Sequence, residues 1–115
     1  MEDMDIQALK EPVDAVVHEP RRLAILAAVR NTPATFSELK EAVGLTDGNL
    51  DSHLRKLEDA GYVVKEVRSN PLLRRGRETV YKATEKGRSA LDGYLDSMER
   101  RLEEAKVAAA SGAPS

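Results

Sequence analysis

Arginine and lysine side chains gather in the middle third of this chain. Residues 53–88 contain ten Lys or Arg and five Asp or Glu, although the formal net charge of the whole chain is −2. The stretch RSNPLLRRGR carries no acid. Its Pro and Gly predict a flexible loop, which would carry the guanidinium groups of Arg68, Arg74, Arg75 and Arg77. Guanidinium groups bind phosphates and enter narrow minor grooves. We therefore expect these arginines to contact nucleic acid, with a solvated basic loop as the alternative.

A second set of polar side chains lies in the segment LTDGNLDSHLRKLEDAGYV, just before the basic loop. Leu50, Leu54 and Leu57 recur at helical spacing and define the buried face of a short helix. The opposite face, at about 100° per residue, carries candidate DNA contacts at Gly48, Asn49, Ser52, Arg55 and Lys56. Amide and hydroxyl groups near a helix N-terminus suit base edges, and the two basic side chains suit phosphate or guanine. Gly48 would permit a close approach of the backbone.

Three residues of this helix have more than one interpretation. Asn49 is also a residue type that caps helices. Asp51 would repel phosphate unless it pairs with Arg55 one turn later or accepts a hydrogen bond from a cytosine amino group. His53 lies nearer the buried side of the helix, so a half-buried structural role stands beside DNA contact.

The composition argues against several other kinds of chemistry. The chain has no cysteine, which removes disulfides, thiolate metal sites and cysteine nucleophiles. It has two histidines and no catalytic motif, so we expect no metal, no cofactor and no enzymatic activity. One Phe and three Tyr leave little surface for stacking on single strands, which favours duplex DNA. No apolar window approaches the about 18 residues of a membrane span, and the acidic start MEDMD lacks the basic region of a signal peptide, so we expect a cytoplasmic protein.

The helices that must position these side chains can be predicted from the spacing of apolar residues and from the Pro, Gly and capping residues at helix ends. Proline suits the first turn of a helix, so short helices are expected near 12–18 and 20–30. A brief extended piece at 34–36 precedes a helix that Ser37 would cap and Gly44 would end. After a short turn, Thr46 or Asp47 caps the helix that ends at Gly61. Two short helices joined by a turn that contains Gly form a helix-turn-helix.

The second half of the chain reads as a hairpin followed by a long helix. The stretches YVVKEV and ETVYKAT are rich in Val, Tyr and Thr and predict two strands with a basic tip between them. At this tip Leu72 and Leu73 would fold back onto the domain or contact a partner subunit. Thr84 is expected to cap a final helix that continues to about Lys106. The fold class is therefore mostly α with a small β-hairpin (α+β).

The long final helix predicts a dimer. At about 30 Å it exceeds what so small a core can cover. Its apolar stripe then needs the N-terminal segment, a second subunit or both, and the expected interface comprises Leu91, Tyr94, Leu95, Met98 and Leu102 with Ile6 and Leu9. A monomer with an intramolecular helical lid is the alternative. The expected organisation is an N-terminal arm or helix at 1–11, a DNA-binding domain at 12–88, a dimerisation helix at 84–106 and a disordered tail at 107–115.

The order of these elements, with the motifs LTDGNLDSHLRKLEDAGYV and GRETVYKATEKGRSAL, resembles the winged-helix transcriptional regulators related to the MarR and ArsR families. The resemblance covers about residues 12–95. It implies a dimeric, sequence-specific regulator of promoters, with the helix at about 47–60 in the major groove and the basic wing at 68–77 on the minor groove or backbone. We expect a repressor that occludes an inverted repeat, and the sequence identifies no effector. The alternative is a winged-helix protein-interaction module without DNA binding.

Overall fold

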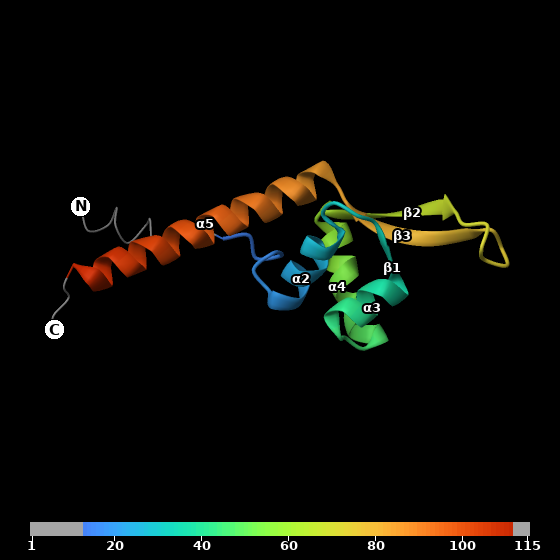
Figure 1. Cartoon of the computed structure of the whole chain (residues 1–115), viewed down its shortest axis with the longest axis horizontal. Coiled ribbons are helices and arrows are strands. Elements are labelled where there is room, and N and C mark those ends of the chain that lie inside the picture. The colour runs from blue at the N-terminus through green and yellow to red at the C-terminus, as the bar shows by residue number, and fades with distance from the viewer. Residues whose placement is uncertain (1–12, 112–115) are drawn as a thin grey trace.

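The computed structural model describes residues 13–111 of the chain. Its elements are α2 (Pro20–Val29), β1 (Ala34–Thr35), α3 (Phe36–Val43), α4 (Asp47–Asp59), β2 (Val63–Ser69), β3 (Arg77–Ala83) and α5 (Glu85–Ala110). The helices α2, α3 and α4 form a body from which the β2–β3 hairpin extends on one side and α5 on the other (Figure 1). The strands form an antiparallel sheet in the order β1-β3-β2. This is the predicted α+β winged helix.

The core of the body is made by the faces that helical spacing predicts. Leu50, Leu54 and Leu57 of α4 are all buried. They join one core cluster with other buried side chains, which are Val17, Ile25, Leu26, Val29, Leu39, Val63, Tyr81, Ala83 and Leu91. Because α4 buries a leucine at every turn, its opposite face is held outward.

The helix α3 begins two residues earlier than a Ser37 cap would place it. Its N-cap is Thr35, whose hydroxyl accepts a hydrogen bond from the Glu38 backbone N–H at 3.1 Å. The Glu38 carboxylate accepts in turn from the Thr35 backbone N–H at 2.8 Å. This reciprocal capping box satisfies two backbone donors. The Ser37 prediction was wrong because three residues beyond Ser37 stands Lys40, which cannot accept such a bond.

The segment before α2 is a turn in its described part, where a helix near 12–18 was predicted. The Asp14 carboxylate accepts from the backbone N–H groups of Val16 at 2.9 Å and Val17 at 3.2 Å, and residues 15–17 form a turn. A short acidic side chain that bonds the following backbone competes with helix formation. Glu19 is extended, as favoured before Pro20, and its side chain caps α2. The helix prediction therefore fails over residues 13–18.

The helix α5 begins where predicted and ends later. Thr84 is its N-cap, with its hydroxyl accepting from the Gly87 backbone N–H at 2.9 Å. A Cβ atom at Gly87 would lie 2.1 Å from the Tyr62 carbonyl oxygen, so only glycine allows this close packing. The helix continues to Ala110, which makes residues 107–110 of the predicted disordered tail helical. Alanine has the highest helix propensity and extends the helix through the sequence VAAA. Ile6, Leu9 and the rest of the predicted N-terminal arm, with residues 112–115 of the predicted tail, lie outside the described residues.

Candidate nucleic-acid interface

The outer face of α4 presents the polar side chains that the helical wheel predicts. Gly48, Asn49, Ser52, Arg55 and Lys56 are all exposed. Thr46 is the N-cap, and its hydroxyl accepts from the Asn49 backbone N–H at 3.2 Å. Within the described residues the side chains of Asn49 and Ser52 have no hydrogen-bond partner. Asn49 is therefore not the capping residue, and its amide is available to an external partner.

Two acids in the N-terminal half of α4 are paired with neighbouring cations. The Asp51 carboxylate lies 3.0 Å from Arg55 Nε, which is the first of the two alternatives that the sequence offered for Asp51. Asp47 lies 2.8 Å from Lys40 Nζ. The Arg55 side chain is still 73% exposed. The ion pair is made through Arg55 Nε.

His53 lies on α4 and contacts the start of α2 through Arg22. Its Nδ1 is 3.2 Å from Nη1 of Arg22, whose guanidinium also donates to the backbone carbonyls of Val16 at 2.7 Å and Ala15 at 3.3 Å. Burial lowers the pKa of His53, and the nearby positive charge of Arg22 lowers it further, against the opposing effect of Glu19. A neutral imidazole accepts a hydrogen bond from Arg22 here. His53 thus occupies the half-buried position that the sequence offered as the alternative to DNA contact.

One face of the wing is neutralised by its own ion pairs. Glu66 lies 2.7 Å from Lys82, and Arg68 Nε lies 2.7 Å from Glu78. Hydrogen bonds from the side chains of Arg68 and Asn70 hold the pKa of Glu78 below its usual range. Arg68 therefore differs from the other predicted wing arginines, because its charge is balanced within the hairpin.

The other face of the wing carries basic side chains and no acid. Residues that pair across antiparallel strands share a face, and the register pairs Lys65 with Tyr81, Val67 with Thr79 and Ser69 with Arg77. Tyr81 packs in the core with the leucines of α4, so this face continues toward α4. Lys65 Nζ lies 6.0 Å from the centre of the Tyr81 ring. Sequence reasoning did not select Lys65, although its two-residue spacing from Val67 and Ser69 could have found it.

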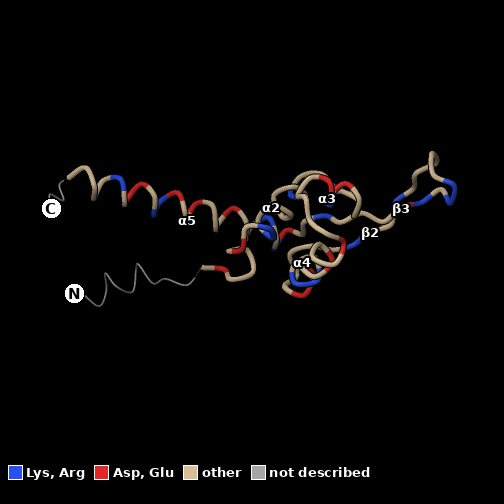
Figure 2. The backbone as a smooth tube through the Cα atoms, turned by 90° about the horizontal axis from the view of Figure 1, so that it is seen from below, with Lys and Arg blue, Asp and Glu red and all other residues tan. Residues whose placement is uncertain are grey.

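The wing tip is held by its own hydrogen bonds. The Asn70 backbone N–H donates to Gly76 O at 2.8 Å, and the Gly76 N–H donates to Leu73 O at 2.9 Å. The side chains of Arg74, Arg75 and Arg77 are exposed, and within residues 13–111 none of them has an ion-pair or hydrogen-bond partner. Figure 2 shows the resulting run of Lys and Arg along the hairpin and its tip. Leu72 and Leu73 are 92% and 42% exposed, so neither folds back onto the domain.

The apolar stripe of α5 is covered at one end only. Leu91 is 1% exposed, whereas Leu95 and Leu102 further along the same face are 47% and 58% exposed. Tyr94 and Met98 are half-buried, and the Tyr94 hydroxyl lies 2.6 Å from His18 Nδ1. The body of the domain therefore packs against the start of this stripe and leaves the rest in solvent.

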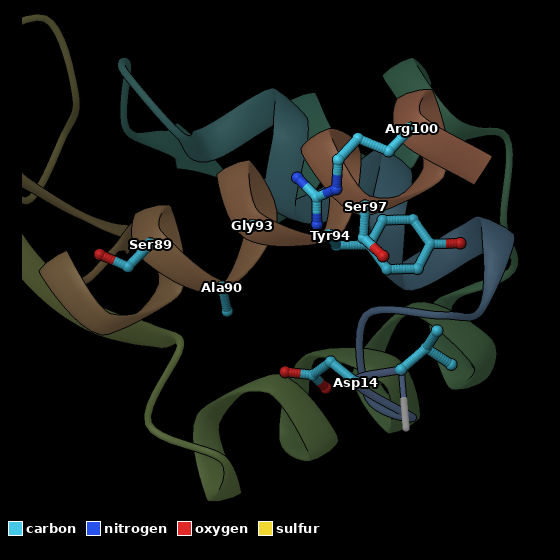
Figure 3. A pocket seen from close by; sticks show the side chains of 8 residues that line it. Asp14, Ser89, Ala90, Gly93, Tyr94, Ser97 and Arg100 are labelled. Carbon is cyan, nitrogen blue, oxygen red and sulfur yellow. The ribbon is translucent and has the colours of Figure 1, made fainter. Parts of the chain in front are cut away.

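A hollow of about 280 Å³ lies between the start of the described chain and α5. Figure 3 shows Asp14 on one side of it and a row of α5 residues on the other, and the lining comprises Val13, Asp14, Ser89, Ala90, Gly93, Tyr94, Ser97 and Arg100. The Asp14 carboxylate is already used, because it accepts a hydrogen bond from the Tyr62 hydroxyl and caps the turn beside it. No group of three or more His, Cys, Asp or Glu in residues 13–111 is placed to hold a metal ion. Among the helices described, none combines the length and apolarity that crossing a bilayer requires.

Comparison with known proteins identifies the family. Residues 21–102 match the family model described as winged helix DNA-binding domain. The chain belongs to this family. A transcriptional regulator homologue protein from Pyrococcus horikoshii OT3 has a winged-helix structure that aligns with a TM-score of 0.71 and 27% identity, over 91% of this chain and 98% of that one.

More distant winged-helix structures share the fold. The structure of MarR aligns with a TM-score of 0.59 and 24% identity, over 74% of this chain and 60% of that one. A PadR family transcription regulator from Clostridium difficile R20291 aligns with a TM-score of 0.61 and 18% identity, over 82% of this chain and all (100%) of that one. The predicted resemblance to winged-helix regulators is confirmed, and this is a DNA-binding domain of the kind found in transcriptional regulators.

A sequence relative comes from Methanocaldococcus jannaschii. This uncharacterized protein is 46% identical to the present chain over 61 residues, which are 52% of the present chain. The chain spans 62% of the length of that relative.

Proposed function

We propose that this protein is a dimeric transcriptional repressor that binds an inverted repeat in duplex DNA. The observation that carries the proposal is the surface formed by the outer face of α4 and the acid-free face of the wing. Its polar and basic side chains are exposed, and four acids nearby, Asp47, Asp51, Glu66 and Glu78, are paired with cations. Such a surface matches the negative charge of DNA despite the acidic composition of the chain.

In this proposal α4 lies in the major groove and reads base edges from its N-terminal half. Asn49 pairs with adenine and Ser52 donates to or accepts from a neighbouring base, because both side chains are exposed and without partners. Asp51 orients Arg55 by binding its Nε, and the two terminal nitrogens then bond guanine. Lys56 contacts phosphate, and Gly48, which has no side chain, allows the N-terminus of α4 to approach the DNA backbone closely.

The wing supplies contacts that do not depend on sequence. Arg74, Arg75 and Arg77 follow the phosphates or enter the minor groove, and Lys65 adds a cation on the face toward α4. Arg68 contributes less, because Glu78 already balances its charge. We assign His53 to the contact between α2 and α4 rather than to DNA.

A second copy of the chain covers the open part of α5 in this proposal. Leu95 and Leu102 are exposed on the face that buries Leu91, which supports a helix-to-helix interface beyond the body. A two-fold dimer presents its recognition helices to major-groove segments about one helical turn apart. The bound site is then an inverted repeat with centres roughly 10 base pairs apart.

The protein acts by occupying DNA and catalyses no reaction. A regulator that occupies chromosomal promoters works in the cytoplasm of a bacterium or an archaeon, and we propose that location for it.

Selection of bound sequences from random duplex DNA tests this function. Enrichment of an inverted repeat would support both sequence reading and two-fold symmetry. Enrichment of single half-sites would retain sequence reading and remove the dimer. Failure to retain any duplex at low salt would contradict DNA binding and favour the protein-interaction module.

A further inference from the structure

Leu72 is the most exposed of the large apolar side chains in the described chain, at 92%. It stands at the tip of the wing, between Pro71 and Leu73. Turns on a protein surface are usually built from small and polar residues. An apolar side chain held in water at the far end of a basic hairpin indicates a partner that offers both negative charge and an apolar interior.

Hydrogen bonds hold the backbone of the tip on both sides of Leu72. The Asn70 side chain accepts from the Leu72 backbone N–H at 3.1 Å, and Asn70 O accepts from the Leu73 N–H at 3.0 Å. Gly76 closes the turn with a φ of 71°, a conformation that favours glycine. A fixed backbone reduces the entropy lost when the side chain enters a binding site.

The charges around Leu72 match a polyanion. Arg74 and Arg75 follow it on the same turn, and Arg77 begins β3, all three exposed and without side-chain partners in residues 13–111. The nearest acids along the chain, Glu66 and Glu78, are paired with Lys82 and Arg68. Stacked bases between two phosphate strands provide the apolar interior and the surrounding negative charge in one molecule.

The length of the hairpin suits the minor groove next to the segment that α4 would occupy. The seven residues of β2 span about 23 Å at about 3.3 Å each. A major groove and the adjacent minor groove are separated by half a helical turn, which is about 17 Å along the duplex. The tip therefore reaches the minor groove while α4 remains in the major groove.

We propose that Leu72 is a wedge that enters the minor groove, partly unstacks one base step and bends the DNA. This inference rests on the proposed function, since it requires a duplex bound by α4 and the wing. Apolar wedges of this kind kink DNA by about 20–90° toward the major groove. The step next to the wing tip is then a flexible pyrimidine–purine step such as TA or CA, which unstacks most readily.

The bend angle of bound DNA tests the wedge. It is measured by energy transfer between dyes at the two ends of a duplex that carries the selected site. Wild-type protein and the Leu72→Met variant should shorten the end-to-end distance, because both side chains are apolar and long. Leu72→Ala and Leu72→Gln should bind straight DNA with the same dependence on salt, because every arginine is retained. Val107→Ala, which trims an exposed apolar side chain on α5, is the matched control and should bend DNA like the wild type.

A second measurement places the wedge at one step. A fluorescent adenine analogue at the predicted step should brighten when wild-type protein binds and stay quenched with Leu72→Ala. Equal bending by the wild type and Leu72→Ala, or bound but straight DNA with the wild type, would overturn the wedge and leave the proposed function intact. Absence of any binding by the wild type would instead contradict the proposed function.

Two further outcomes would assign Leu72 to another partner and overturn the proposal. In light scattering without DNA, a smaller assembly for Leu72→Ala than for the wild type would mean that the tip contacts a second copy. Co-sedimentation of the wild type, but not of Leu72→Ala, with vesicles of anionic phospholipid would mean that the tip enters a membrane surface. The wedge requires that the two proteins behave alike in both experiments.

Discussion

Side chains on α4 differ in how firmly the folded chain holds them. Arg55 is oriented by Asp51, and His53 is fixed against Arg22 beside the body. Asn49 and Ser52 have no side-chain partner in the described chain and pay their ordering entropy only when they bind. Arg55 and His53 are therefore held in place by the folded chain, whereas Asn49 and Ser52 supply free polar groups that could hydrogen-bond to a base edge.

Replacing Asn49 or Ser52 by Ala should distinguish sequence-specific recognition of bases from nonspecific binding to DNA. Each change removes base contacts that form only on a matching site, so affinity for the selected DNA should fall by about 1–3 kcal/mol with little change on random DNA. Fluorescence anisotropy on the two duplexes measures both values. Thermal unfolding of each variant is the control, and equal losses on both duplexes would assign these residues to positioning only.

The stability of the domain should depend on pH through His53. Its pKa in the folded protein is lowered from the ordinary 6.5, first by burial and then by Arg22, so the unfolded chain binds the proton more readily. The stabilising contribution is complete above pH 6.5 and is lost as the pH falls from 6.5 through the folded pKa. As the pH is lowered through this window, the urea concentration at the midpoint of unfolding should fall for the wild type and should fall less for His53→Gln. An identical slope for His53→Gln and the wild type would contradict the assignment.

At the scale of elements, the wing has a paired face and an open face. The charges of Glu66 and Glu78 are balanced by Lys82 and Arg68, whereas Lys65 and Arg77 share the acid-free face. A single hairpin can thus present net positive charge in one direction only. This explains how a chain with a net charge of −2 retains a surface for a polyanion.

Salt dependence should distinguish the two faces. Replacing both Arg75 and Arg77 by Ala should reduce the slope of log affinity against log salt by about 1.8, since each phosphate contact contributes about 0.9. The matched control is Arg68→Gln combined with Glu78→Gln, which removes an ion pair without changing the net charge. That control should keep the wild-type slope. A double alanine variant with an unchanged slope would remove the wing from the DNA interface.

Local patterns predicted the elements, and cross-strand register decided the details. The leucine spacing of α4 and the Thr84 cap depend on neighbouring residues, and both predictions are confirmed. The pairing of Arg68 with Glu78 depends on which residues of β2 and β3 face each other, and a sequence of alternating types does not specify this. The face on which Lys65 lies follows from the two-residue spacing along β2, and only its pairing with Tyr81 depends on the register. The hairpin register therefore had to be observed before the wing could be divided into two faces.

Local competition explains two errors at the starts of helices. Thr35 displaced Ser37 as a cap because Glu38 completes a reciprocal bond, and Asp14 formed a turn where a helix was predicted. Both outcomes use side-chain bonds to nearby backbone groups, which helical periodicity does not take into account.

At the scale of the molecule, side-chain bonds fix the direction of α5 relative to α4. Arg30 Nε donates to Asp92 at 2.9 Å and ties α2 to α5. The Tyr62 hydroxyl donates to Asp14, and burial together with this bond raises the pKa of Tyr62 to about 12. Because α2 also packs against α4, the angle between the recognition helix and α5 is set by the body of the domain. A dimer formed through α5 would then hold its two recognition helices at a defined separation.

A charge introduced at Leu95 tests this link between assembly and recognition. In a dimer through α5, Leu95→Glu would bury an unpaired carboxylate at the interface, which is strongly unfavourable. The variant should be a folded monomer, because Leu95 is already 47% exposed in the single chain. Specific affinity should fall toward the nonspecific level, since the second half-site no longer adds its contacts through effective concentration.

Light scattering and DNA binding measure the two consequences together. Val107→Glu is the matched control, because it places the same charge on an exposed position of α5 away from the apolar stripe. It should remain dimeric and retain specific binding. A wild-type protein that is monomeric at tens of micromolar would exclude the α5 dimer. A dimeric Leu95→Glu variant would move the interface elsewhere and leave the half-site spacing to be set by another surface.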